Sequence, residues 1–335
     1  GIGLAHRRLA ILDVSPLGRQ PMISRSERYV IVFNGEIYNH LDIRRQLPNT
    51  QWRGHSDTET LLAGFDAWGI VPTLKRAVGM FAVALWDRQT RTLTLIRDRL
   101  GEKPLYYGWV GDTFIFGSEL KALRRHPSFN ADIDRNALAA FLRYSYVPTP
   151  TSIYRCIHKL LPGSLLTLRP NDRSSTHAVP HRYWSLLAVA RKGLERPFVG
   201  SENDALASLE SRLSESVRLQ QVADVPLGAF LSGGIDSSMI VALMQSHACR
   251  PVRTFTIGFD DAQYNEAHHA KVVAQHLGTD HTELYVTADE AQGVIPLLPT
   301  MYDEPFADVS QIPTFLVSQL ARRSVTVSLS GDAGD

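Results

Sequence analysis

The hydrophobic pattern of the chain changes about halfway along, and this change limits the folds that the chain can adopt. Up to about Arg169, short β-branched and aromatic runs alternate with turn residues, and few helical stretches interrupt them. From Glu202 onward, apolar strands alternate with amphipathic helices. Successive strands predict antiparallel sheets, whereas strand–helix alternation predicts a parallel sheet with helices on its faces. With 335 residues, the chain is long enough to form both as separate domains.

The first half is predicted to form an α+β layered domain, with two antiparallel sheets and flanking helices. The helix expected over 56–68 begins with Ser56 and Glu59 in capping-box spacing. A second helix is expected over 136–146. The expected strands are 29–39, 79–87, 92–98, 104–110 and 113–119. This domain is assigned to residues 1–170, and the polar, aperiodic stretch 171–200 is interpreted as a linker.

Residues 201–335 are predicted to form an α/β domain with a doubly wound parallel sheet. The expected elements are helices over 204–222, 237–246, 265–278 and 311–323, and strands over 226–232, 252–259, 281–286 and 324–330. Such sheets bind ligands at the carboxyl ends of their strands. The loops that leave those ends are 232–238, 258–266 and 330–335.

The composition is that of a globular protein, with 44% hydrophobic residues, 21% charged residues and a net charge of +1. This balance predicts neither a nucleic-acid nor a membrane partner. No apolar run approaches the ~20 residues that cross a bilayer, and no signal peptide opens the chain, so a cytoplasmic location is expected. Cys156 and Cys249 match no metal-ligand or redox spacing. Because no Met opens the chain and its last residues lie in a glycine-rich loop, the sequence is interpreted as a fragment that lacks residues at both ends.

The sequence Ser-Gly-Gly-Ile-Asp-Ser-Ser at 232–238 joins an apolar strand to an amphipathic helix. Such a turn directs backbone N–H groups at an anion near a helix N-terminus, and its glycines let a phosphate approach. A Walker A loop would end in Gly-Lys-Ser/Thr, but here Asp236 stands in place of the lysine. A carboxylate beside phosphates requires a metal between them, for which Mg²⁺ is the natural choice. The alternative is a tight glycine turn capped by Asp and Ser.

This segment resembles the PP-loop of the N-type ATP pyrophosphatases, which cleave ATP between its α- and β-phosphates. The resemblance implies ATP and Mg²⁺ as cofactors, with Asp236 and Asp335 as metal ligands and Asp332 supporting the formation of an acyl adenylate. Ala333 replaces the glycine that is usual in the second nucleotide loop of that family. The implied ATP-binding residues are Leu231, Ser232, Gly233, Gly234, Asp236, Ser237, Ser238, Ile257, Gly258, Ser330 and Gly331.

The first half contains "GLAHRRLAILD", "FNGEIYNH", "GHSDTETLL" and "RDRLGEKPLYYG…FGSELKAL", in that order. Together these resemble the class II, N-terminal-nucleophile (Ntn-type) amidotransferase domain of the glutamine-hydrolysing asparagine synthetase family, and the resemblance covers nearly the whole chain. The segment "DEPFADVSQIPTF", with Glu304, Asp308 and Ser310, also matches that family, but we assign it no chemistry. The Asp98, Arg99 and Lys103 cluster is interpreted as a buried ion-pair network.

Glutamine hydrolysis needs groups that hold the substrate and groups that stabilise the oxyanion. Arg8 can pair with the α-carboxylate, Asp57 can accept the α-ammonium, and Asn34 with the Gly35 N–H can stabilise the tetrahedral oxyanion. The glutamine-binding residues implied by the resemblance are Arg8, Leu9, Ala10, Ile11, Leu12, Asn34, Gly35, Glu36 and Asp57. The alternatives are a surface arginine at position 8, an Asn-Gly hairpin turn and a helix-capping aspartate at position 57.

The family's nucleophile is a cysteine at the mature N-terminus, and Gly1 cannot replace it. We therefore expect the chain as printed to lack glutaminase activity. The expected function of the family's full protein is asparagine synthase (glutamine-hydrolysing), with glutamine, ATP and aspartate as substrates. Two alternative functions stay open: amidation of another carboxylate acceptor, such as a sugar acid of surface-polysaccharide biosynthesis, and a non-catalytic nucleotide-binding homologue. A homodimer is a possible assembly. A tRNA-thiolating or guanine-nucleotide synthetase is disfavoured by the amidotransferase half.

Overall fold

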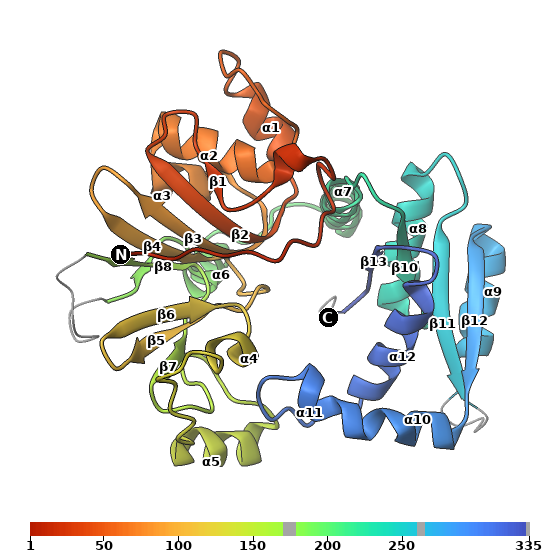
Figure 1. The fold of residues 1–335 in the computed structure, drawn as a ribbon. Coiled ribbons are helices and arrows are strands. Elements are labelled where there is room, and N and C mark those ends of the chain that lie inside the picture. Colours follow the sequence, from red (N-terminus) through yellow and green to blue (C-terminus); the bar gives the residue numbers. More distant parts are fainter. Residues whose placement is uncertain (170–178, 260–264, 333–335) are drawn as a thin grey trace. The chain divides into compact units, whose positions relative to one another are not determined.

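The structure is a computed structural model that describes residues 1–169, 179–259 and 265–332 (Figure 1). The chain forms two compact units. The first unit comprises Gly1–Pro197 together with Tyr302–Ala307, and the second comprises Phe198–Met301 and Asp308–Asp335. The short segment Tyr302–Ala307 therefore belongs to the first unit, although its neighbours on both sides in the sequence belong to the second.

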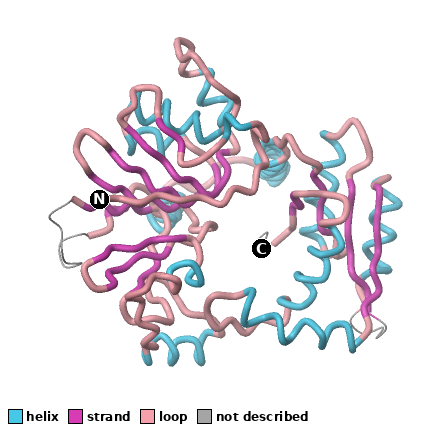
Figure 2. The backbone as a smooth tube through the Cα atoms, in the orientation of Figure 1, coloured by secondary structure: helices cyan, strands magenta, loops and turns pink. Residues whose placement is uncertain are grey.

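The larger sheet of the first unit is antiparallel and has the strand order β1-β2-β3-β4-β8-β9. Its strands are β1 (Met22–Ile23), β2 (Tyr29–Ile37), β3 (Gly79–Asp87), β4 (Thr92–Arg97), β8 (Ser164–Leu168) and β9 (His181–Arg182). A second antiparallel sheet has the order β6-β5-β7, formed by β5 (Tyr106–Val110), β6 (Thr113–Gly117) and β7 (Ile157–Lys159). Both sheets are drawn in Figure 2.

Successive side chains of the central strands point to opposite faces of the larger sheet and pack in two separate cores. Ile31 and Phe33 of β2 pack with apolar residues of the helices on one face of the larger sheet, whereas Val32 packs on the other face with residues of β4 and β8 and against Phe114 and Phe116 of β6. The larger sheet thus lies between a helical layer and the smaller sheet. The helices of the first unit are α1 (His40–Arg45), α2 (Asp57–Trp68), α3 (Ile70–Arg76), α4 (Leu120–Leu123), α5 (Arg135–Tyr144) and α6 (Leu186–Glu195), with the 3₁₀ turn η1 (Pro16–Gly18).

The second unit contains a four-stranded parallel sheet of order β12-β11-β10-β13. Its strands are β10 (Leu227–Phe230), β11 (Arg253–Phe259), β12 (Asp280–Val286) and β13 (Val327–Leu329). One face packs on α7 (Glu202–Gln220), α8 (Ile235–His247) and α9 (Ala267–Leu277). The other face packs on α10 (Ala288–Val294), α11 (Leu298–Met301) and α12 (Gln311–Ala321), and the 3₁₀ turn η2 (Ile295–Leu297) joins α10 to α11.

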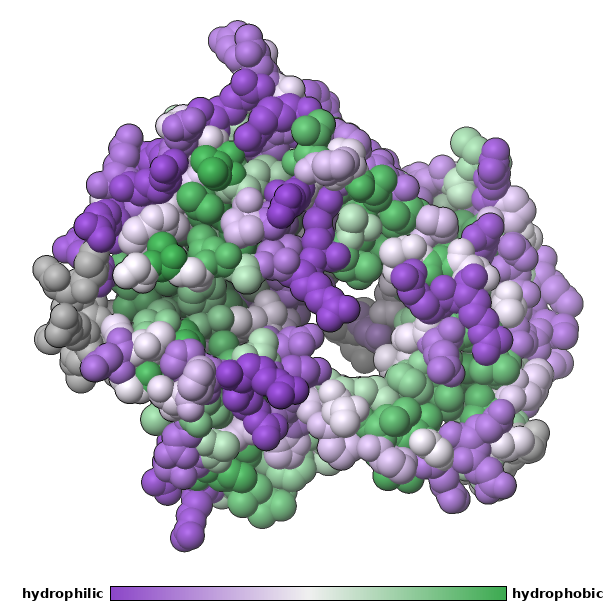
Figure 3. All heavy atoms as spheres, viewed as in Figure 1, coloured by the Kyte–Doolittle hydropathy of each residue, from purple (hydrophilic) through white to green (hydrophobic). Residues whose placement is uncertain are grey.

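These observations confirm the predicted fold class, with antiparallel sheets in the first half and a parallel sheet in the second. The stretch 171–200, where a linker was expected, contains α6 and the short strand β9, which pairs with β8. Leu138 and Leu142 of α5 are exposed apolar side chains. Figure 3 shows hydrophobic residues at the surface over this helix. Within the described residues, none of the helices combines the length and the apolar character that crossing a bilayer requires.

Candidate functional site

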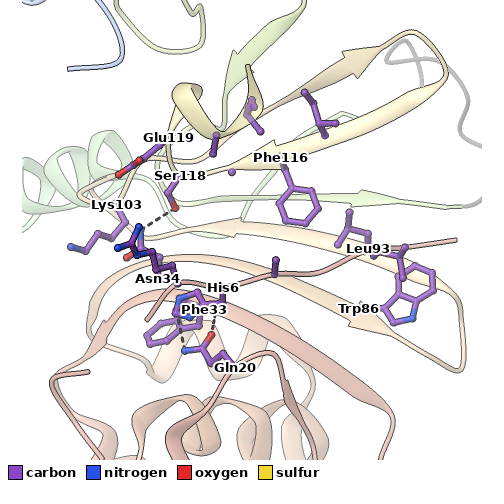
Figure 4. Close-up of a pocket in the computed structure, with 18 of the residues that line it drawn as sticks. His6, Gln20, Phe33, Asn34, Trp86, Leu93, Lys103, Phe116, Ser118 and Glu119 are labelled. Carbon is purple, nitrogen blue, oxygen red and sulfur yellow. Dashed lines mark hydrogen bonds between the residues drawn. The ribbon is translucent and has the colours of Figure 1, made fainter. Parts of the chain in front are cut away.

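The first unit contains a cavity of about 1360 Å³. Of the nine residues expected to bind glutamine, Ala10 is not among those that line it, and the other eight are: Arg8, Leu9, Ile11, Leu12, Asn34, Gly35, Glu36 and Asp57. Figure 4 shows Asn34, Lys103, Ser118 and Glu119 gathered at one end of this cavity. Trp86, Leu93 and Phe116 lie at the other end. The cavity therefore has a polar end, formed by residues that are far apart in the sequence, and an apolar end.

Arg8 is held by the backbone of its own loop. Its Nη2 donates to the carbonyl oxygens of Leu12 and Asp13, at 2.6 and 2.8 Å. The guanidinium lies directly against Gly18, where a Cβ atom would come within 2.3 Å of Nη2. These contacts fix the plane of a half-buried guanidinium at the cavity wall, so Arg8 is not a freely rotating surface arginine. A fixed guanidinium plane favours two-pronged binding of a carboxylate.

Asn34 and Gly35 do not form the hairpin turn that an Asn-Gly pair often indicates. Both lie within β2, opposite Ala82 and Phe81 of β3. Gly35 has φ of +155°, and a Cβ atom there would come within 2.1 Å of the Met80 carbonyl oxygen. Only glycine fits at this position, because a side chain would collide with the neighbouring strand. The Asn34 amide donates from Nδ2 to Ser118 Oγ at 3.0 Å (Figure 4).

Glu36 and Asp57 are two buried carboxyl groups beside this pair. Ser56 caps α2, so Asp57 is not the capping residue; its carboxylate accepts from the N–H groups of Ile37 and Thr58 at 2.9 and 2.8 Å. Burial, followed by the nearby Asp57, raises the pKa of Glu36 to about 7. Burial also raises the pKa of Asp57 to about 6, against the lowering effect of its backbone hydrogen bonds and of Arg8. Two buried carboxyl groups that each raise the cost of the other's charge favour a cation between them.

If the cavity binds glutamine, as the sequence resemblance implies, these pKa values predict that binding depends on pH, because an α-ammonium group pairs only with ionised carboxyls. Both carboxyls bind protons as the pH falls through about 7 and about 6. The affinity for glutamine should therefore be roughly tenfold lower at about pH 6 than at about pH 8. Binding at about pH 7 should release part of a proton, which isothermal titration in buffers of different ionisation enthalpy measures. Glu36→Gln should abolish most of this release, and an affinity that stays constant over the range would contradict the assignment.

The cluster around Asp98 is not the ion-pair network that the sequence indicated. The fully buried Asp98 carboxylate accepts hydrogen bonds from five backbone N–H groups, those of Phe81, Leu100, Gly101, Glu102 and Lys103. The buried arginine of the motif is Arg97, whose guanidinium donates to the carbonyl oxygens of Gly101, Lys103 and Leu160. Backbone groups, rather than opposite charges, therefore satisfy these side chains.

Three residues of the cavity wall were assigned no role in glutamine binding from the sequence. Ser118 contacts Asn34, and Lys103 lies close enough to lower the pKa of Glu36 against the dominant effect of burial. Gln20 holds the backbone of Phe33 in both directions, accepting from its N–H at 2.6 Å and donating to its carbonyl at 3.1 Å. Both Ser118 and Lys103 lie inside the motif "RDRLGEKPLYYG…FGSELKAL", and this position was the one feature of the sequence that could have indicated a place in the site.

In the second unit, the Ser-Gly-Gly loop leaves the carboxyl end of β10, and α8 begins at Ile235. The loop is tightened by Ser237, whose Oγ lies 2.9 Å from Ser232 Oγ and accepts from the Ser232 N–H at 3.2 Å. Gly233 has φ of +83°, and a Cβ atom there would come within 2.6 Å of the Ala270 nitrogen in α9. Among the described residues, no side chain caps the start of α8. Leu231, just before the loop, is buried in the core.

The loop that begins at Ser330, the second loop expected to contact a nucleotide, lies against the Ser-Gly-Gly loop. A Cβ atom on Gly331 would come within 2.6 Å of the Ser237 nitrogen, so the two loops touch through their backbones. Ser330 Oγ donates to the exposed Asp332 carboxylate at 2.8 Å. Ile257 and Gly258 lie near the carboxyl end of β11, beside β10 in the sheet. Asp335, the second expected metal ligand, and part of the loop 258–266 lie outside the described residues.

The residues present fit a nucleotide with its metal. Gly331 keeps a side chain out of the space beside the start of α8, and Ser238 Oγ is buried with no hydrogen-bond partner in the described chain. An orphaned hydroxyl beside a helix N-terminus suits a phosphate oxygen. The described part of the chain holds no group of three metal-binding side chains. Mg²⁺ commonly takes only one or two carboxylates and completes its coordination with phosphates and water, so Asp236 can serve in such a site.

Comparisons with known proteins match the two units of the chain to two different families. Residues 1–184 match the family described as the glutamine amidotransferase domain, and residues 208–335 match the family described as asparagine synthase. Asparagine synthetase [glutamine-hydrolyzing] 1 of Bacillus subtilis (strain 168) is 34% identical, over 100% of this chain and 51% of its own length. Asparagine synthetase [glutamine-hydrolyzing] 3 of the same strain is 32% identical, over 98% of this chain and 55% of its own length.

A more distant relative carries another name. Amidase chry2 of Gibberella zeae is 30% identical over 83% of this chain and 42% of its own length. The chain thus spans about half the length of the curated relatives named above. Both halves match in the same order as in the two synthetases. The chain belongs to the glutamine-hydrolysing asparagine synthetase family.

Proposed function

We propose that this chain is the amidotransferase and nucleotide-binding part of an asparagine synthase that uses glutamine as its nitrogen donor. The overall reaction would convert ATP, L-aspartate, L-glutamine and water into L-asparagine, L-glutamate, AMP and pyrophosphate. One observation carries the proposal: Arg8, Asn34, Gly35, Glu36 and Asp57 line one cavity in a chain that also bears a glycine-rich phosphate loop on a parallel sheet. The setting would be the cytoplasm.

In the glutamine cavity, the proposed roles follow from charge and geometry. The fixed Arg8 guanidinium would bind the α-carboxylate, and the buried Asp57 and Glu36 carboxylates would bind the α-ammonium. The second N–H of the Asn34 amide and the Gly35 N–H would stabilise the oxyanion that forms at the side-chain carbonyl. Each such donor is worth roughly 3 kcal/mol of the barrier. The products would be glutamate and ammonia.

In the second unit, the Ser232–Ser238 backbone and hydroxyls would bind the phosphates of ATP, and Asp236 and Asp335 would hold Mg²⁺. When bound, Mg²⁺ would neutralise charge on the departing pyrophosphate. Ile257 and Gly258 would face the adenosine, and Ser330 and Gly331 would contact the nucleotide. Asp332 would support the attack of the carboxylate on the α-phosphate, which gives an acyl adenylate that ammonia then displaces with loss of AMP.

The test is pyrophosphate release by the complete protein encoded by the gene, measured with ATP, Mg²⁺ and a panel of carboxylates. We expect release with aspartate and with no other common amino acid, and equimolar asparagine when glutamine is supplied. Release with a different acid would mean that this acid, rather than aspartate, is the acceptor, and the proposed ligase chemistry would stand. No release with any acid would contradict the proposal.

From the residues that line the cavity, we expect residues 1–335 to bind glutamine but not to hydrolyse it. Cys156 and Cys249 are not among the residues that line the cavity, so neither thiol can attack a bound substrate there. Glutamate formation, followed with glutamate dehydrogenase, should stay at the background rate, while isothermal titration detects binding. Turnover at a rate typical of enzymes, about 1 per second or more, would show that another group in the cavity is the nucleophile.

A second candidate function keeps the chemistry and changes the acceptor. The relative named an amidase shows that proteins similar over most of this chain carry names other than asparagine synthetase. The acceptor would then be another carboxylic acid, such as a sugar acid, activated by the same nucleotide loops. The carboxylate panel described above distinguishes the two.

A further inference from the structure

The six residues Tyr302–Ala307 leave the second unit and pack in the first. Glu304 anchors them. Its carboxylate forms an ion pair with Lys159 of β7, and the two side chains are only 10% and 12% exposed. The same carboxylate accepts from the Ile153 N–H at 2.7 Å and lies 3.4 Å from the Tyr106 hydroxyl. A buried charge with this many partners fixes its segment of backbone in place.

This anchor places Asp303 at the start of α4. The Asp303 carboxylate accepts from the Leu120 N–H at 2.5 Å through Oδ2, and its Oδ1 lies 3.5 Å from Lys121 Nζ. The Asp303 side chain is 12% exposed. The residue that precedes α4, Glu119, provides no side-chain cap, so a residue distant in sequence satisfies the first helical N–H. An acidic group at this end also suits the helix dipole.

Helix α4 follows directly on the loop that carries Ser118. Leu120 and Leu123 of α4 are buried, so the helix is fixed to the core of the first unit on one side and to Asp303 at its start. Two residues before Leu120, Ser118 Oγ accepts a hydrogen bond from Asn34 Nδ2. Two hydrogen bonds, joined by the short stretch of chain from Ser118 to Leu120, therefore connect Asp303 in series to the amide proposed to stabilise the oxyanion.

We propose that Asp303 is a positioning residue for glutamine hydrolysis, which it supports by holding α4 and thereby Ser118 against the Asn34 amide. This inference rests on the proposed function. The Ser118 hydroxyl fixes one N–H of that amide and so orients the other toward the substrate carbonyl. If Ser118 moves, the amide can rotate, and its donor is lost from the oxyanion. Arg8 and Asp57, which would bind the substrate in its ground state, do not contact this series.

The test uses the complete protein encoded by the gene and measures the kinetics of glutamine hydrolysis. Asp303→Ala should lower kcat about tenfold and change KM less than about twofold, because an oxyanion donor acts mainly in the transition state. Asp303→Asn keeps an oxygen that can accept from Leu120 and should recover most of kcat. Lys121→Ala is the matched control: it removes the other partner of Asp303, leaves the Leu120 hydrogen bond intact, and should keep kcat within about twofold of wild type.

A double variant distinguishes the proposed positioning role of Asp303 from a purely structural one. Ser118→Ala should lower kcat about tenfold, and Asp303→Ala/Ser118→Ala should be no slower than Ser118→Ala alone, since both changes act on the same contact. Multiplicative losses, or a lower melting temperature with unchanged kcat, would overturn the inference. Should Asp303→Ala fail to fold, a wild-type kcat in Ser118→Ala would overturn it. If the wild-type protein hydrolyses no glutamine, the proposed function fails; if it does and Asp303→Ala is equally fast, only this inference fails.

Discussion

Asp236→Asn is expected to reduce ATP-dependent pyrophosphate release by about a thousandfold while leaving the fold intact. Asp236 occupies the second position of α8, directly after the Ser-Gly-Gly turn, and the described chain gives its carboxylate no hydrogen-bond partner. A carboxylate at a helix start contributes only about 0.3–1 kcal/mol to stability. Its proposed work is to hold Mg²⁺ on the phosphates, and an uncharged amide is a much weaker ligand for that hard cation. Removing one such electrostatic contact commonly costs ~10²–10³ in rate.

The measurement is pyrophosphate release by the complete protein across a range of Mg²⁺ concentrations, with melting temperature as the check on folding. Asp289→Asn provides a matched control, because Asp289 is the second residue of α10 in the same unit and is exposed. It should release pyrophosphate at the wild-type rate. High Mg²⁺ should recover part of the activity of Asp236→Asn. If both variants keep activity within about threefold of wild type, Asp236 is a helix-start residue and nothing more.

The regular elements could be predicted from the sequence because burial repeats along them. The strand expected over 29–39 is β2 over Tyr29–Ile37, and the helix expected over 56–68 is α2 over Asp57–Trp68. Strand β7 was not predicted. It is three residues long and has one fully buried side chain, Ile157, so it lacks a repeating pattern. Short elements of this kind form because a neighbouring strand offers hydrogen bonds, and a sequence does not reveal which neighbour that is.

The cavity proposed to bind glutamine shows that side-chain contacts, too, are only partly predictable from the sequence. Arg8, Asn34 and Asp57 each stand in a motif, and the fold brings all three to one cavity. The hydrogen bond between Asn34 and Ser118 joins residues 84 positions apart, and no local pattern predicts such a contact. The Asn-Gly pair was open to a turn interpretation because local preference favours it. Both residues instead pair with β3 within the sheet, so the turn does not form.

The packing of Tyr302–Ala307 in the first unit could not be predicted for a related reason. Six residues between two helices carry no periodicity, and their acidic residues are typical of an exposed loop. The partners of Glu304, namely Lys159, Ile153 and Tyr106, are some 150 to 200 residues away in sequence. Domain boundaries drawn from composition follow the chain and therefore miss a segment that crosses from one unit to the other.

Asp98→Ala is expected to destabilise the first unit by at least about 4 kcal/mol. The substitution would leave five N–H groups without their acceptor, and each donor that stays buried and unsatisfied costs about 1–3 kcal/mol. Water entering the new space would recover part of this, so the sum of the five is an upper bound. Two of the affected groups belong to Lys103 and Phe81, beside Glu36 and opposite Gly35. Glutamine binding should therefore fail together with the fold of this unit.

Urea unfolding measures this prediction, with separate probes for the two units because a chain of two units need not unfold in one step. Asp98→Asn is the graded variant: its one carbonyl oxygen can keep the three hydrogen bonds that Oδ1 accepts from Leu100, Gly101 and Glu102, while its NH₂ group faces the N–H groups of Phe81 and Lys103. Asp98→Asn should lower the free energy of unfolding of the first unit by about half as much as Asp98→Ala. Asp112→Ala, at an exposed aspartate of the β5–β6 turn, should change stability by less than about 0.5 kcal/mol. Equal effects of Asp98→Ala and Asp112→Ala would mean that water replaces the carboxylate without loss, and that the backbone from Leu100 to Lys103 holds its conformation unaided.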